Sequence, residues 1–164
     1  MMRSIVIGAA MIAVSASAAL AQSQGGEKKD VAFDIGSNVP LALLLKLNDG
    51  LWIRPDFTFA HIDDGNGVTS WRFGIGGSVL GTVHRAGPLA TYLGGRFGYD
   101  WYSRSNSPTD WSLAGIFGAR YKLDAHFGVS AETGLLYQKL SFPGGGPNQK
   151  VVEPWTRLSA LLYF

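Results

Sequence analysis

The stretch RLSALLYF, residues 157–164, alternates two kinds of side chain and ends on an aromatic residue. Arg157 and Ser159 share one set of alternate positions. The other set is apolar throughout and consists of Leu158, Ala160, Leu162 and Phe164. A period of two is typical of a β-strand whose two faces meet different surroundings. Terminal residues of soluble chains usually fray in water. A terminus that keeps this alternation up to its aromatic last residue therefore indicates a strand held in a sheet.

The same alternation continues through most of the chain, with apolar side chains at odd positions until the last strand changes parity. Ile53, Phe57 and Phe59 are examples, and charged residues such as Arg54 and Asp56 lie between them. The pattern predicts an all-β fold of eight antiparallel strands. Their expected ranges are 30–36, 40–47, 51–61, 70–83, 89–102, 111–123, 126–142 and 151–164.

Composition excludes several other classes of protein. The 164 residues include 22 glycines, 12% aromatics, 16% charged residues and no cysteine. Disordered chains lack the aromatics, and helical bundles avoid so many glycines. Without cysteine there is no disulfide framework and no thiolate zinc site. The net charge is only +2 and no dense Lys/Arg run occurs, so no nucleic-acid partner is expected.

The first 21 residues are typical of a cleaved signal peptide. Arg3 precedes an apolar stretch from Ile5 to about Val14, and Ala19-Leu20-Ala21 gives the small-x-small cleavage pattern. That stretch is shorter than the about 20 residues that a membrane-spanning helix needs. We therefore expect a signal peptide at 1–21, a flexible polar leader at 22–29 and one barrel domain at 30–164.

A closed sheet with one apolar and one charged face is compatible with two kinds of barrel. One is a soluble barrel with an apolar interior, and the other is a membrane barrel with an apolar exterior. Short breaks at 48–50, 84–88 and 124–126 alternate with longer ones at 62–70, 103–110 and 143–150. Large aromatics gather next to the longer breaks, as an interface belt would require. The predicted belt consists of Trp71, Trp101, Trp111, Tyr137 and Trp155. Both features favour the membrane barrel, with the longer loops outside the cell.

Three motifs together resemble the small outer-membrane β-barrel family of Gram-negative bacteria, the group that includes OmpX-, Ail- and OmpA-type barrels. They are the ALAQ ending of the leader, the glycine-rich alternating strands and the closing RLSALLYF. The resemblance implies export to the outer membrane as a monomer in contact with lipid and lipopolysaccharide. It also implies handling by periplasmic chaperones and the barrel assembly machinery, with Leu158, Ala160, Leu162 and Phe164 as the C-terminal assembly signal.

The first hairpin is the one place where the strand count is open. Odd parity runs unbroken from Val31 to Leu47, so residues 31–47 could form one long strand and leave seven in total. An even number returns the chain end to the side where it began. We therefore expect two strands here, joined at the short turn SNVP of residues 37–40.

An eight-stranded barrel is only wide enough for its own side chains to fill, so we expect its inward charges to pair. The predicted interior network consists of Asp34, Arg54, Asp56, Arg72, Arg96, Asp100, Arg120, Glu132 and Arg157. The alternative is an ion path through those charges, which would make the protein a narrow channel.

No motif for catalysis, a metal or a cofactor is found. His61, with Asp63, Asp64 and Ser70 near it in sequence, is the one candidate for a lipid A-modifying site. The spacing of His, Ser and Asn found in such deacylases is missing, so we expect no enzyme and no cofactor. The remaining expectation is a structural or surface-exposed protein with loop-mediated binding or adhesion.

Overall fold

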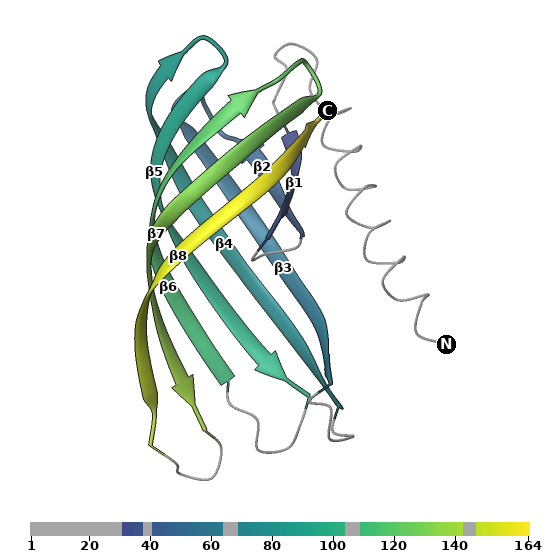
Figure 1. The fold of residues 1–164 in the computed structure, drawn as a ribbon, viewed down its shortest axis with the longest axis vertical. Helices are drawn as coiled ribbons and strands as arrows, with labels where there is room; N and C mark the ends of the chain where they lie inside the picture. The colour runs from purple at the N-terminus through teal and green to yellow at the C-terminus, as the bar shows by residue number, and fades with distance from the viewer. Residues whose placement is uncertain (1–30, 38–40, 64–68, 104–108, 143–146) are drawn as a thin grey trace, which may run out of the picture.

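Eight antiparallel strands, paired in chain order and closed into a ring by β1 and β8, make up the fold (Figure 1). The structure is a computed structural model that describes residues 31–37, 41–63, 69–103, 109–142 and 147–164. The strands are β1 (Val31–Gly36), β2 (Leu41–Lys46), β3 (Leu51–Asp63), β4 (Thr69–Ala86), β5 (Leu89–Tyr102), β6 (Thr109–Lys122), β7 (Phe127–Ser141) and β8 (Gln149–Tyr163). The predicted all-β, eight-stranded antiparallel fold is confirmed.

The first hairpin has two strands, as predicted. Val31 of β1 lies opposite Leu45 of β2, and the register continues to the pair Asp34 and Ala42. On its other edge β1 pairs with the terminal strand, from Ala32 opposite Tyr163 to Gly36 opposite Ser159. The alternation in RLSALLYF therefore does belong to the strand that closes the ring.

The turn predicted at residues 84–88 is tighter in the structure. Strand β4 continues to Ala86 and β5 begins at Leu89, so the connection is Gly87-Pro88. Gly87 has a φ of 57°, a left-handed conformation that costs little without a side chain. A register shift between Thr82 and His84 lets the longer β4 stay paired with β5 up to this turn.

The strands differ strongly in length, and this makes the wall uneven. β1 and β2 have 6 residues each, whereas β3 to β8 have 13 to 18. Leu158 of β8 is hydrogen-bonded to Ser37. On the N-terminal side of Leu158, the described part of β8 pairs with β7 alone. β3 likewise pairs with β2 only as far as Phe57. Figure 1 shows the short hairpin filling the wall between β8 and β3 only near the end that holds the C-terminus.

The two faces of the sheet carry opposite kinds of side chain. Buried inward positions are mainly even in β1 to β7 and odd in β8: Arg157 is 1% exposed and its neighbour Leu158 is 69% exposed. The outer surface is rich in exposed aliphatic and aromatic side chains, such as Phe57, Phe97 and Leu135. The predicted parity and its change in the last strand are confirmed.

An apolar layer also lies inside the barrel, beside the charges. It consists of Ala32, Leu44, Trp52, Leu80, Tyr92, Ala114, Ile116, Trp155, Leu161 and Tyr163. The inward positions of Leu161 and Tyr163 follow from the parity of the last strand, but the rest of this layer was not predicted. Several of its members come from the strand ends near the short turns, so that end of the interior is packed like a small hydrophobic core.

No helix in the described ranges is long and apolar enough to span a membrane. The predicted signal peptide (1–21) and leader (22–29) lie outside the described residues. The same is true of residues 64–68, 104–108 and 143–146 in the three longer loops.

Candidate functional site

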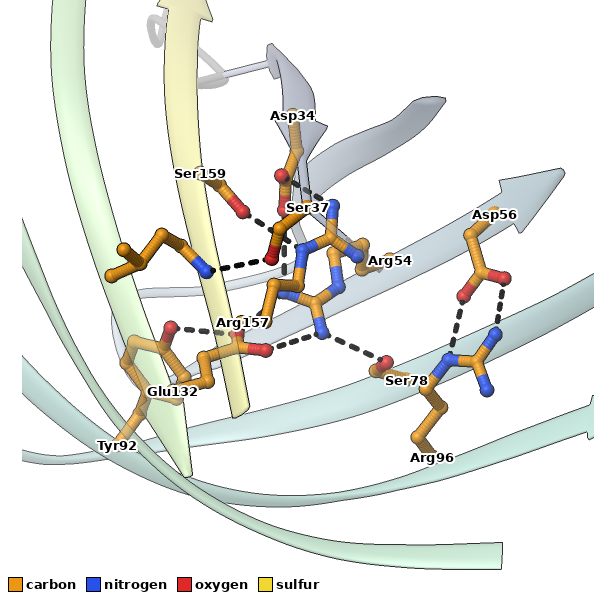
Figure 2. Close-up of polar contacts among 11 residues, drawn as sticks. Asp34, Ser37, Arg54, Asp56, Ser78, Tyr92, Arg96, Glu132, Arg157 and Ser159 are labelled. Carbon is orange, nitrogen blue, oxygen red and sulfur yellow. Dashed lines mark hydrogen bonds and ion pairs between the residues drawn. The ribbon is translucent and has the colours of Figure 1, made fainter. Parts of the chain in front are cut away.

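The centre of the barrel is crossed by an ion pair between opposite walls. Arg54 lies on β3 and Glu132 on β7, four strands away in a ring of eight. Nη1 and Nη2 of Arg54 donate to Oε1 and Oε2 of Glu132 at 2.5 and 2.9 Å. Both side chains are at most 1% exposed. This two-bond fork joins the guanidinium and the carboxylate across the interior of the barrel (Figure 2).

Asp34 of β1 joins a second arginine to this pair. Its two carboxylate oxygens accept hydrogen bonds from Nη1 of Arg54 at 3.2 Å and from Nη2 of Arg157 at 2.6 Å. Arg157 also donates from Nε to Ser159, at 2.8 Å. Two arginines and two carboxylates from four strands thus form one buried cluster with no net formal charge (Figure 2). Such compensation is what allows charges to remain ionised away from water.

Two neutral side chains complete this central cluster. The Tyr92 hydroxyl donates to Oε1 of Glu132 at 2.7 Å, and Nη2 of Arg54 donates to the Ser78 hydroxyl at 3.2 Å. Neither residue belongs to the predicted network. Their even positions in β5 and β4 were the available signal, since this parity points inward.

Two further arginine–carboxylate pairs lie between the central cluster and the long-loop end. Arg96 donates to both oxygens of Asp56 at 2.7 and 3.2 Å. Arg72 does the same to Asp100, at 2.8 and 3.0 Å. Together with the central cluster, these pairs bring eight of the nine predicted network residues into arginine–carboxylate contacts.

The ninth predicted residue, Arg120, lies toward the short turns and has a different environment. Its guanidinium carbon lies 4.0 Å from the centre of the Trp52 ring, a cation–π contact. Both side chains are buried. Arg120 therefore belongs with the apolar layer at this end, next to the charged centre.

Inward-facing glycines provide the space that these large side chains occupy. A Cβ on Gly76 would lie 2.8 Å from Nη2 of Arg96 and 2.9 Å from a backbone oxygen of β5. At Gly118, a Cβ would lie 2.6 Å from the Tyr92 ring. Real Cβ atoms do not approach this closely, so these glycines are needed for room inside a narrow barrel.

Four of the five predicted belt residues lie on the outer wall near the long loops. Trp71 stacks on Phe59 with ring centres 4.9 Å apart, and Trp101 stacks on Phe73 at 5.8 Å. The Trp111 and Tyr137 rings are 5.4 Å apart on neighbouring strands β6 and β7. These contacts form an aromatic surface where the strands meet the loops.

Trp155 does not belong to this belt, so its assignment was wrong. It is 6% exposed and packs in the interior apolar layer. Trp155 shares the parity of Arg157 and Ser159, which face the lumen in β8. The changed parity of the last strand was the signal, and nearness to a loop was misleading because it does not show which face a side chain occupies.

The terminal residue is anchored to the first strand. The Phe164 amide donates to the Val31 carbonyl oxygen at 2.9 Å, and the Phe164 ring meets the Phe33 ring edge-on at 5.2 Å. The ring is nevertheless 60% exposed on the outer wall. Leu158, Ala160 and Leu162 lie on the same outer face.

The short turns are held by carboxylates. Oδ1 of Asp124 accepts hydrogen bonds from the amides of His126 and Phe127 at 2.6 and 2.7 Å, and these two donors lower the pKa of Asp124. Asp49 pairs with Lys46 at 2.8 Å, which lowers the pKa of Asp49. Both carboxylates therefore stay ionised in mild acid.

The histidines show no catalytic arrangement in the described part of the chain. The His61 ring lies 4.4 Å from the Trp71 ring on the outer wall, while His84 and His126 are exposed near the short turns. Asp64 lies outside the described residues. Within the described ranges, no group of three or more His, Asp or Glu side chains is placed to hold a metal ion.

Solved structures with the same arrangement of strands are small outer-membrane barrels. Neisserial surface protein A matches with a TM-score of 0.53 and 18% sequence identity, over 82% of this chain and 94% of that one. This is the fold of a small outer-membrane barrel. The E. coli outer membrane protein W shares the fold with a TM-score of 0.51 and 13% identity, over 86% of this chain and 100% of that one. No family model and no curated protein sequence matches the chain.

Proposed function

We propose that this chain is an integral protein of the bacterial outer membrane. The observation that supports the proposal is the reversed distribution of its side chains. Large apolar residues such as Phe57 and Leu158 lie exposed on the outer wall, and Arg54, Glu132 and Arg157 are buried within. Water would penalise such an outer surface, whereas lipid tails match it. The natural contacts of this wall are then outer-membrane lipid and lipopolysaccharide.

Cell fractionation tests the location. We expect the mature protein to remain with washed outer membranes and to migrate differently on gels before and after heating, as closed barrels do. Recovery in the soluble periplasmic fraction would contradict the proposal. Export through the signal peptide is tested in the same cells, because cleavage after Ala21 should leave Gln22 as the first residue.

The proposed barrel is closed to ions. The bonds between Arg54 and Glu132 cross its full width, and the Arg96–Asp56 and Arg72–Asp100 pairs follow toward the long loops. A narrow channel would need these groups to be hydrated. We expect no unitary conductance from the wild-type protein in planar bilayers, and regular conductance steps would favour the channel instead.

The role that fits a closed barrel is structural or surface-exposed, with the longer loops as the binding region. The strands that carry two of these loops remain paired up to their ends, at Asp63 opposite Thr69 and Leu140 opposite Gln149. Recognition on rigid scaffolds is usually carried by loops. An epitope tag inserted between residues 104 and 108 should be labelled on intact cells. Labelling only after permeabilisation would reverse the proposed orientation.

We propose no catalytic role. The His61 ring packs against Trp71 on the outer wall, which supports a place in the aromatic surface. Cells overexpressing the wild-type protein should have the same lipid A mass spectrum as cells expressing His61→Ala. A deacylated or acylated species present only with the wild type would support the enzyme.

We also propose that the protein assembles as a monomer, with the help of periplasmic chaperones and the barrel assembly machinery.

A further inference from the structure

Two lysines face each other on the outer wall near the long loops. Lys139 of β7 and Lys150 of β8 are register partners, one step before Leu140 and Gln149, where the pairing of these strands ends. Outward positions are odd in β7 and even in β8, so both lysine side chains belong to the outer face. Directly opposed residues of an antiparallel pair have Cβ atoms about 4.5–5.5 Å apart, so the two ammonium groups share one small area of the surface.

The two positive charges have no negative partner on this part of the wall. In the described ranges of β6, β7 and β8, Lys139 and Lys150 are the only charged residues at outward positions. Neither lysine forms an ion pair with a described residue. Like charges directly opposite each other destabilise a sheet. A pair of cations without a carboxylate beside it therefore favours an anion from outside the protein.

The position of the pair along the wall matches the depth of lipid headgroups. From Phe127 to Tyr137 the outward residues of β7 carry no charge, and neither do their register partners on β8, from Leu162 to Val152. Ten residue steps of about 3.3 Å, along a strand tilted by about 40°, give a height of about 25 Å, which is the height of the apolar band of such barrels. Lys139 is the next outward residue of β7, so its ammonium group lies just beyond the hydrocarbon.

Aromatic rings lie beside the lysines at the same height. Trp111 of β6 is the register partner of Lys139, and Tyr99 of β5 is the register partner of Trp111. The Trp111 and Tyr137 rings lie 5.4 Å apart. Tryptophan and tyrosine rings favour the level of lipid headgroups. The row of outward residues from Tyr99 through Trp111 and Lys139 to Lys150 thus combines aromatic faces with two cations.

We propose that Lys139 and Lys150 bind a phosphate group of lipopolysaccharide. The inference rests on the proposed location and orientation, in which the long-loop end of the wall is surrounded by the outer leaflet. The lipid A headgroup of lipopolysaccharide is a phosphorylated disaccharide. Ammonium groups bind its phosphate as point charges, and the neighbouring Trp111 and Tyr137 rings offer apolar faces at the depth of the sugars.

Binding is tested with the purified mature barrel in neutral detergent, with a chelator present so that no divalent cation can bridge protein and lipid. Native mass spectrometry measures the fraction of barrels that carry one lipid A molecule across a titration. A parallel titration uses lipid A without its phosphates, which keeps the acyl chains and the sugars. We expect saturable binding of lipid A and about tenfold weaker binding of the dephosphorylated form. Equal binding of the two forms, or equal binding of phosphatidylglycerol, would overturn the proposal.

Charge-matched variants locate the site. The double variant Lys139→Gln and Lys150→Gln should weaken lipid A binding about tenfold, equivalent to about 1.4 kcal/mol. The double variant Lys46→Gln and Arg85→Gln removes the same charge at the short-turn end and should bind like the wild type. Heat-dependent gel migration shows whether each variant is folded. An equal loss in both double variants, or no loss in the first, would overturn the proposal.

The assay separates this site from the proposed location, because it uses detergent-solubilised protein. A barrel that stays with washed outer membranes but binds no lipid A would overturn the site and leave the location intact. Lysine-dependent binding by a protein recovered from the soluble periplasmic fraction would support the site and contradict the location.

Discussion

Arg54 and Glu132 lie on opposite walls of the barrel and are joined by two hydrogen bonds of 2.5 and 2.9 Å. They are 78 residues apart in the chain. Because three strands lie between β3 and β7 in either direction around the ring, this single contact ties together both halves of the sheet. The pair is therefore a long-range link across the interior, on which the proposed closure of the barrel to ions depends.

Glu132→Gln should lower the free energy of unfolding by about 3–5 kcal/mol, because it leaves the Arg54 charge buried with only part of its compensation. Urea unfolding in detergent micelles, followed by tryptophan fluorescence, measures the change. Glu153→Gln makes the same substitution at an exposed position of β8 and should leave stability almost unchanged. Equal midpoints for the two variants would show that the buried pair contributes nothing.

Removing both members of the pair should open the lumen. In the double variant Arg54→Ser and Glu132→Ser, two long side chains that meet across the interior are replaced by short ones. We expect unitary conductance in planar bilayers where the wild type shows none. A folded double variant that remains silent would mean that the Arg96–Asp56 and Arg72–Asp100 pairs, or the apolar layer at the short-turn end, are enough to close the barrel.

Trp155 and Trp101 should respond oppositely to brominated lipids, which quench indoles that touch the acyl region. Trp101 is 38% exposed on the outer wall, whereas Trp155 is 6% exposed inside. In variants that keep one tryptophan each, we expect strong quenching for Trp101 and weak quenching for Trp155. The reverse order would restore Trp155 to the aromatic belt.

Deleting Phe164 should reduce the fraction of protein assembled in the outer membrane. The deletion removes the ring contact with Phe33 and the hydrogen bond to Val31, both at the seam where the barrel closes. Phe164→Tyr keeps an aromatic ring and the backbone bond, so it should assemble nearly as well as the wild type. The heat-modifiable fraction in washed membranes measures the effect, and full assembly without Phe164 would contradict it.

Asp124→Ala should loosen the turn between β6 and β7 at neutral pH. The pKa of Asp124 is lowered in the folded state by the amides of His126 and Phe127, so its contribution is present above the ordinary carboxyl pKa of about 3.9. That contribution is lost as the pH falls through the lowered value. We therefore expect faster hydrogen exchange of both amides in the variant at about pH 6, with the difference from the wild type narrowing in strong acid.

An Asp124→Asn variant serves as the control, because its amide oxygen accepts the same hydrogen bonds without titrating. The protection of the two amides in this variant should change little as the turn is acidified, whereas in the wild type it should fall. Loss of protection in Asp124→Asn equal to that in Asp124→Ala would show that charge, and not hydrogen bonding, holds this turn.

The sequence predicted correctly which face of the sheet a side chain occupies wherever the odd or even parity of its position was followed strictly. Leu158 and Arg157 were placed correctly because side chains of a strand alternate whatever the strand packs against. Trp155 was misplaced when its distance from a loop was given more weight than its parity. Tyr92 and Ser78 were missed for a related reason: they are inward by parity, but they carry no charge that would draw attention to them.

Sequence alone determined the period of two, the eight strands and the division into an apolar and a charged face, because these depend on local backbone geometry and on residue type. It also identified a set of arginines and carboxylates as the charged residues of the interior. Only the tertiary structure decided which of them meet, since Arg54 and Glu132 approach through closure of the ring and not through any spacing in the chain. The same closure brings Arg85, Arg120 and Lys122 to one cavity and encloses Trp155 in the interior. RLSALLYF determined that the chain ends in a strand, and the register with β1 determined that this strand closes a barrel.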